Sequence, residues 1–190
     1  SYLFPADIVR QDTDTALAAG LSTEWGRSRL SPGNNQPDFD MDPDVVNDPS
    51  LDVIGSLSSL PTVSLVAAGD DLFGNQGIYF HPSRRGTDWE RETSVEIIYP
   101  DGRPGIQVNA GLRIQGAFSR THAKKNGLRL VFKEEFGPTE LEFPLYGADR
   151  VDRFNTLVLR AGFNDSWYSN IGPAEAQYTR DEYNLAVQRA

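Results

Sequence analysis

Residues 93–115 read TSVEIIYPDGRPGIQVNAGLRIQ and determine the fold that the sequence predicts. Two segments rich in apolar and β-branched residues, 93–99 and 106–115, flank a turn with Asp-Gly at its centre, which is typical of a β-hairpin. In the second segment every other residue is apolar, so one face of that strand is expected to be buried. The alternating residues are Ile106, Val108, Ala110, Leu112 and Ile114. The hairpin therefore predicts an antiparallel sheet at the centre of the fold.

Other apolar segments are expected to extend this sheet. They are residues 62–67, 128–133, 154–161 and, as a short strand, 139–143. Short helices are expected around 44–47, over 51–60 with Ser50 as the cap, and over 174–190, where Pro173 precedes the helix. Residues 69–75 have the composition of a turn. The predicted class is α+β, with an antiparallel sheet of about five strands and a C-terminal helix.

Residues 1–50 are rich in Pro, Asn, Asp, Gly and Ser, and we expect an irregular arm or linker there. Residues 51–190 would form the folded unit. Because the last helix carries no C-cap signal before Ala190, we expect the chain to be a fragment of a longer protein.

Composition excludes several classes of protein. The 190 residues include no cysteine, which excludes disulfides and thiolate metal sites, and two histidines are too few for a histidine-rich metal centre. No apolar run approaches the roughly 18 residues of a membrane helix. The net charge of −9 argues against nucleic acids and anionic membranes as partners.

The charge is distributed unevenly along the chain. Residues 110–133 contain six basic and no acidic side chains, whereas the remaining positions carry a net charge of −15. The basic residues are Arg113, Arg120, Lys124, Lys125, Arg129 and Lys133. A basic segment in an acidic chain suggests a small anionic ligand.

The segment that joins two of the predicted strands, residues 111–127, has the residue types of a phosphate site. Arg113 and Gln115 are two residues apart on one strand and so share a face, and Gly116 and Ser119 lie in the turn that follows. Arginine, lysine and turn backbone N–H groups are the usual phosphate ligands. The alternative is a solvated, cation-rich hairpin loop. The segment is not a Walker motif, because Gly116 is followed by Ala117 and Phe118.

The stretch LRIQGAFSRTHAKKNGLRLVFK resembles the CotH family of spore-coat-protein-H-like secretory kinases. That family's pattern is Arg-x-x-Gly-x-x-Ser, then a lysine, then an apolar strand. Arg113, Gly116 and Ser119 match it, followed by Lys125, with Lys124 as the other candidate lysine. Further segments similar to such domains are residues 61–66, 72–79, 81–91, 136–138 and 154–166.

The resemblance implies the first, nucleotide-binding lobe of an atypical protein kinase that uses ATP and Mg²⁺ to phosphorylate Ser or Thr of a protein. Lys125 would contact the ATP phosphates, close to the turn 115–120. The nucleotide-binding residues would be Arg113, Gln115, Gly116, Ser119, Lys124, Lys125, Arg129, Glu175 and Glu182. The catalytic acidic residues would follow Ala190, so this piece is expected to be inactive alone. The resemblance also implies a secreted or cell-surface bacterial protein.

Two acidic features have competing interpretations. Glu175 or Glu182, on the terminal helix, would pair with Lys125 as in typical kinases, or would lie on a solvated helix face. Asn164 and Asp165 would help to hold a metal ion, or would form a turn that satisfies its own backbone.

Two other functions remain open at this point. Trp25, Trp89 and Trp167 could form a sugar platform in a secreted, non-catalytic module that binds carbohydrate or protein. A CotH-like domain that has lost activity could instead serve as a scaffold.

Overall fold

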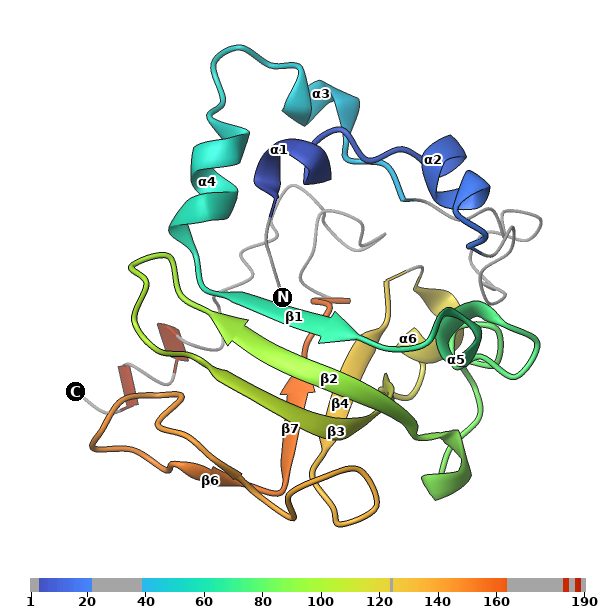
Figure 1. Ribbon diagram of the computed structural model, residues 1–190, viewed down its shortest axis with the longest axis vertical. Helices are drawn as coiled ribbons and strands as arrows, with labels where there is room; N and C mark the ends of the chain where they lie inside the picture. Colours follow the sequence, from blue (N-terminus) through green and yellow to red (C-terminus); the bar gives the residue numbers. More distant parts are fainter. Residues whose placement is uncertain (1–3, 22–38, 124, 164–182, 185–186, 189–190) are drawn as a thin grey trace.

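The computed structural model describes residues 4–21, 39–123, 125–163, 183, 184, 187 and 188 (Figure 1). The fold is α+β, as predicted, with a five-stranded antiparallel sheet in the order β1-β2-β3-β4-β7 and a separate pair, β5-β6. The sheet strands are β1 (Thr62–Val66), β2 (Arg91–Ile98), β3 (Ile106–Gln115), β4 (Gly127–Val131) and β7 (Thr156–Leu159). The pair consists of β5 (Leu141–Glu142) and β6 (Arg153–Phe154).

The predicted hairpin forms the centre of the sheet. β2 and β3 are antiparallel from Ile97 opposite Ile106 to Arg91 opposite Leu112. Gly102 lies in the connecting turn at a φ of 74°, where glycine is favoured because it has no Cβ. β3 has the bounds that its alternation predicts, and the other four sheet strands fall within the predicted segments or one to two residues of them.

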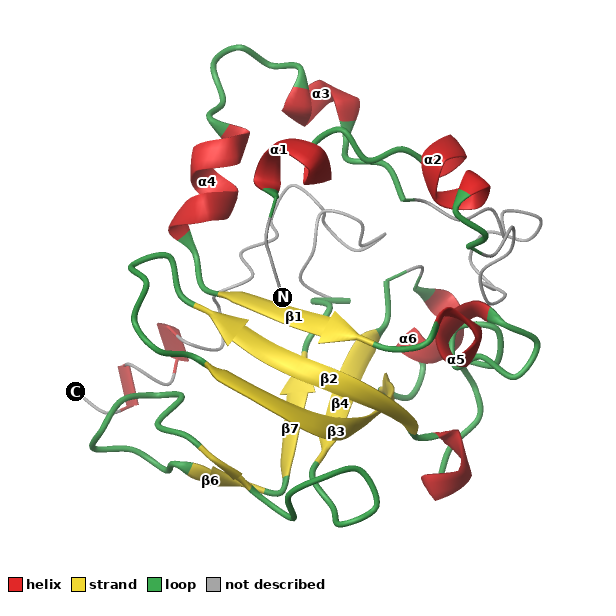
Figure 2. Ribbon diagram, in the orientation of Figure 1, coloured by secondary structure: helices red, strands yellow, loops and turns green. Residues whose placement is uncertain are grey.

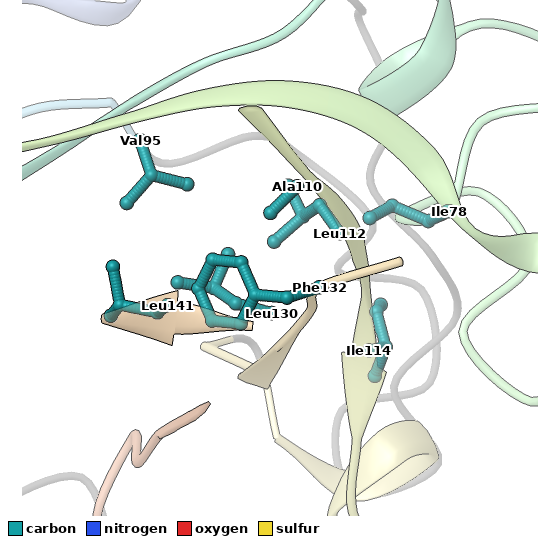
Figure 3. Packing of buried hydrophobic residues seen from close by; sticks show 8 residues of the cluster. All are labelled: Ile78, Val95, Ala110, Leu112, Ile114, Leu130, Phe132 and Leu141. Carbon is teal, nitrogen blue, oxygen red and sulfur yellow. The ribbon is translucent and has the colours of Figure 1, made fainter. Parts of the chain in front are cut away.

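Alternate apolar residues of β3 and β4 lie on one face of the sheet and form the core (Figure 3). Ala110, Leu112 and Leu130 are 2% exposed or less, and Phe132 packs beside them. Ile78 and Leu141 close the cluster from outside the sheet. The period-two pattern of the sequence therefore separates a buried face from a polar one.

The sheet is strongly twisted, and β4 and β7 cross the view of Figure 2 at a steep angle to β1, β2 and β3. Short helices surround it, four of them beyond the β1 edge. These four are α1 (Pro5–Ile8), α2 (Thr13–Ala18), α3 (Pro43–Val46) and α4 (Val53–Ser59). The others are α5 (Gly69–Phe73), η1 (Thr87–Trp89), a 3₁₀ turn, and α6 (Ser119–His122).

Three local predictions are wrong. The N-terminal region contains α1 and α2 in addition to the expected turn at α3, and residues 69–73 form a helix rather than a turn. Helix α4 is capped by Asp52, whose carboxylate accepts from the Gly55 N–H at 2.8 Å, while Ser50 instead donates to Asp48. The C-terminal helix predicted over 174–190 lies largely outside the described residues, of which 183, 184, 187 and 188 are helical.

Candidate functional site

The candidate site is on the face of the sheet opposite the core. Arg113 and Gln115 point to this face because their neighbours Leu112 and Ile114 belong to the core. Arg113 lies directly opposite Arg129 of β4, and Gln115 lies opposite Gly127. The strand pairing therefore brings together the two arginines and the glutamine that the sequence selects.

A buried carboxylate holds part of this basic group. The Glu90 side chain is 3% exposed, and its Oε1 accepts a hydrogen bond from Arg113 Nη1 at 2.9 Å. Its Oε2 lies 2.8 Å from Lys133 Nζ, which is also 2.6 Å from Glu135 Oε2. These two carboxylates neutralise Arg113 and Lys133, so the two cations are ordered but already paired.

Arg129 has no carboxylate partner in the part of the chain that the structure describes. It lies between Arg113 on β3 and Val158 on β7 in the sheet register. Its Nε is buried without a hydrogen bond, and among the described residues none forms an ion pair with its guanidinium. A half-buried cation without a counter-ion among the described residues is unfavourable by itself and would be stabilised by an anion bound nearby.

Arg120 has a structural role that its place in a cation-rich loop does not indicate. Its side chain is turned inward, and the residue is only 7% exposed. The guanidinium donates to the carbonyl oxygens of Gly116 (2.7 Å), Pro82 (2.9 Å), Arg84 (2.8 Å) and Ile114. It therefore fixes the turn after β3 against the loop that precedes η1.

Burial lowers the pKa of the Arg120 guanidinium, and the charges of Arg85, Arg113 and Arg129 lower it further. All four of its acceptors are neutral carbonyls. Within the described ranges no carboxylate pairs with Arg120, so its positive charge adds to that of Arg129 at this end of the sheet.

A cavity of about 470 Å³ opens where β3, β4 and β7 end. Among the described residues, its wall is formed by the turn Gln115, Gly116, Phe118 and Ser119, by Gly127 of β4, and by residues 158 and 160–163. The cavity adjoins the sheet face that carries Arg113 and Arg129, because Val158 in its wall lies directly opposite Arg129 in the strand register. The turn that the sequence predicts near phosphates thus lines the cavity.

Sequence reasoning missed Arg160 and Glu90. Arg160 lines the cavity and continues the alternation of β7, in which Thr156 and Val158 already point away from the core. The alternation of β7 could have placed Arg160 on the same face as Val158. Arg160 was not considered because it lies 27 positions after the end of the basic segment 110–133. Glu90 stands before β2 in a polar stretch, and nothing in that stretch predicts its burial.

The remaining predicted residues are placed differently or lie outside the described part. Lys125 is exposed in the bend before β4 and is not among the residues lining the cavity. Trp89 is half-buried, and the guanidinium carbons of Arg84 and Arg91 lie 5.8 and 5.2 Å from its ring centroid. Trp25, Lys124, Asn164, Asp165, Trp167, Glu175 and Glu182 lie outside the described residues.

No family model, curated protein or solved structure matches the chain. Within the described part of the chain, no helix has the length and apolar character needed to cross a membrane. The described residues also contain no group of three or more histidine or acidic side chains that could hold a metal ion.

Proposed function

We propose that this chain binds the phosphate groups of ATP in the cavity at the end of β3, β4 and β7, as the nucleotide-binding lobe of a CotH-like protein kinase. Phosphoryl transfer to Ser or Thr of a protein, with Mg²⁺, is the activity that the resemblance implies for such a kinase. A secreted or cell-surface bacterial location belongs to the same proposal.

The observation that carries the proposal is Arg129, a half-buried cation beside the cavity for which no described residue supplies a counter-ion. A polyanion is the ligand class that suits it, because charge-assisted hydrogen bonds from arginine to phosphate are short and strong. Arg160 and Gln115 add a second cation and a neutral amide to the cavity wall. Glu90 is occupied by Arg113 and Lys133, so it does not oppose an anion as a free carboxylate would.

The turn 116–119 supports the same ligand. Gly116 adopts a φ of 124°, a backbone conformation that residues with a Cβ rarely adopt, so glycine is favoured in this turn. The Arg120 guanidinium stabilises the turn by donating hydrogen bonds to the carbonyl oxygens of Gly116 and Ile114. A rigid turn with a hydroxyl beside several cations is suited to positioning phosphates, which is most of what a protein contributes to phosphoryl transfer.

Isothermal titration calorimetry with ATP, with and without Mg²⁺, tests the proposal on the chain and three variants. Arg129→Ala should weaken binding roughly tenfold or more, because it removes a charged hydrogen bond. Arg103→Ala is the matched control, since Arg103 lies in the hairpin turn at the other end of β3, where it contacts the exposed Asp101 and the ring of Tyr99. Its affinity should equal that of the unmodified chain.

The variant Lys125→Ala tests a residue that only the CotH resemblance assigns to the phosphates, because Lys125 does not line the cavity. A loss of affinity with this variant adds the lysine to the site, whereas unchanged affinity limits the site to the sheet face and the cavity. Absence of saturable ATP binding by the unmodified chain would overturn the proposed function. An equal loss in Arg129→Ala and Arg103→Ala would show that binding is non-specific attraction.

A further inference from the structure

The cavity has an aromatic wall as well as a basic one. Phe118 and Phe163 line it together with Arg160, and their ring centroids are 6.1 Å apart. Phe118 is 61% exposed, although it is a large apolar side chain in a loop of polar and charged residues. The core does not use this ring, because its cluster lies on the opposite face of the sheet.

The ring of Phe118 is held in a fixed orientation. It stacks on His122, with centroids 3.5 Å apart and an angle of 16° between the planes. His122 Nδ1 lies 2.9 Å from the carbonyl oxygen of Phe118, so the imidazole is anchored by a donated hydrogen bond across one turn of α6. Among the described residues, the only other ring beside Phe118 is the tilted ring of Phe163, and Phe118 is 61% exposed, so part of its surface can contact another planar group.

A cavity that offers one aromatic face and several cations suits a ligand with a planar ring at one end and negative charge at the other. We infer that Phe118 is the stacking platform for the nucleobase, and that the ligand class is therefore a nucleotide rather than inorganic phosphate or a sugar phosphate. This inference rests on the proposed function and assigns the end of the cavity that takes the base. Stacking on a phenyl ring accepts every base, so it predicts weak discrimination among ATP, GTP and CTP.

Calorimetric titrations with ATP and with inorganic tripolyphosphate test this assignment, because only ATP carries a base. Phe118→Ala should weaken ATP binding roughly tenfold and leave tripolyphosphate binding unchanged, given the strength of aromatic–base stacking. Phe118→Tyr keeps the ring and should keep the ATP affinity. Arg129→Ala should weaken both ligands, since it acts on the phosphates they share.

The possible outcomes distinguish the two proposals. If neither ligand binds the unmodified chain, the proposed function fails and the assignment of the base fails with it. If both bind and Phe118→Ala changes neither, or weakens both equally, only the stacking role is overturned. Should Phe118→Ala lower the thermal unfolding midpoint, Phe118→Leu, which keeps apolar bulk without a π face, must show the same selective loss of ATP affinity.

Discussion

Replacing Arg120 by alanine should destabilise the fold more than any substitution of an exposed cation in the same segment. The guanidinium donates to four backbone carbonyls, from residues 82, 84, 114 and 116. Two of these bonds, to Pro82 and Ile114, are buried. Alanine leaves their acceptors without a donor and without access to water.

The expected cost follows from these contacts. Each buried carbonyl left without a partner costs about 1–3 kcal/mol, while the two partly buried ones can turn to water at little cost. Relief of the desolvated, uncompensated charge of Arg120 offsets part of this loss. We therefore expect Arg120→Ala to lower the free energy of unfolding by about 3 kcal/mol, a large share of the roughly 5–15 kcal/mol of a typical domain.

Urea denaturation followed by circular dichroism measures this loss directly. Arg120→Lys keeps the charge but has no planar fork to reach several carbonyls, so it should lose about half as much. Arg150→Ala, an exposed cation, should change the free energy of unfolding by less than about 0.5 kcal/mol. Two results would refute this role of Arg120 as a donor to several backbone carbonyls. One is a loss below about 1 kcal/mol for Arg120→Ala, and the other is an unchanged free energy of unfolding for Arg120→Lys.

Three further predictions concern the site and its pH dependence. Glu90→Gln should lower the free energy of unfolding by about 3 kcal/mol in urea denaturation, because it leaves two cations without their buried counter-ion, and a loss below about 1 kcal/mol would contradict that. Gly116→Ala should cost about 1–3 kcal/mol through backbone strain at its positive φ, and an unchanged thermal midpoint would show that the turn tolerates a Cβ. Burial raises the pKa of Tyr79, and the contacts of Lys133 with Glu135 and Glu90 raise the pKa of that amine. Both groups hold their protons more tightly in the folded state, so their stabilisation is complete below about pH 10 and is lost as the pH rises through the raised pKa values. Urea denaturation at pH 8, 10 and 11 should show a free energy of unfolding that falls above pH 10, and the fall should be smaller in Tyr79→Phe. A free energy of unfolding that does not change over this range would contradict the raised pKa values of the two groups.

The sheet and one half of the site could be predicted because both follow from alternation. Leu112 and Ile114 had to be buried if β3 was half-buried, and this alone placed Arg113 and Gln115 on the other face. Strand pairing then brought Arg129 opposite Arg113. These inferences need only local sequence and the two-residue period of a strand.

The rest depends on contacts between residues far apart in the chain. Arg120 resembles a solvated loop cation until the carbonyls of Pro82 and Arg84, 38 and 36 positions away, come within reach. Glu90 is buried by cations 23 and 43 residues later. Lys125 was expected close to the turn 115–120, but its side chain is exposed in the bend before β4 and does not line the cavity.

The most direct test of a phosphate-binding cavity at the end of the sheet is an ATP titration of the ¹⁵N-labelled chain followed by NMR. The account predicts saturable shifts of backbone amide signals in residues 115–119, 127–129 and 158–163, with the hairpin turn 100–105 unaffected. Tripolyphosphate should also shift the backbone amide signals of the turn 116–119, because it carries the same phosphate groups. Shifts spread evenly over the surface, or no saturable shift at the cavity, would contradict the account.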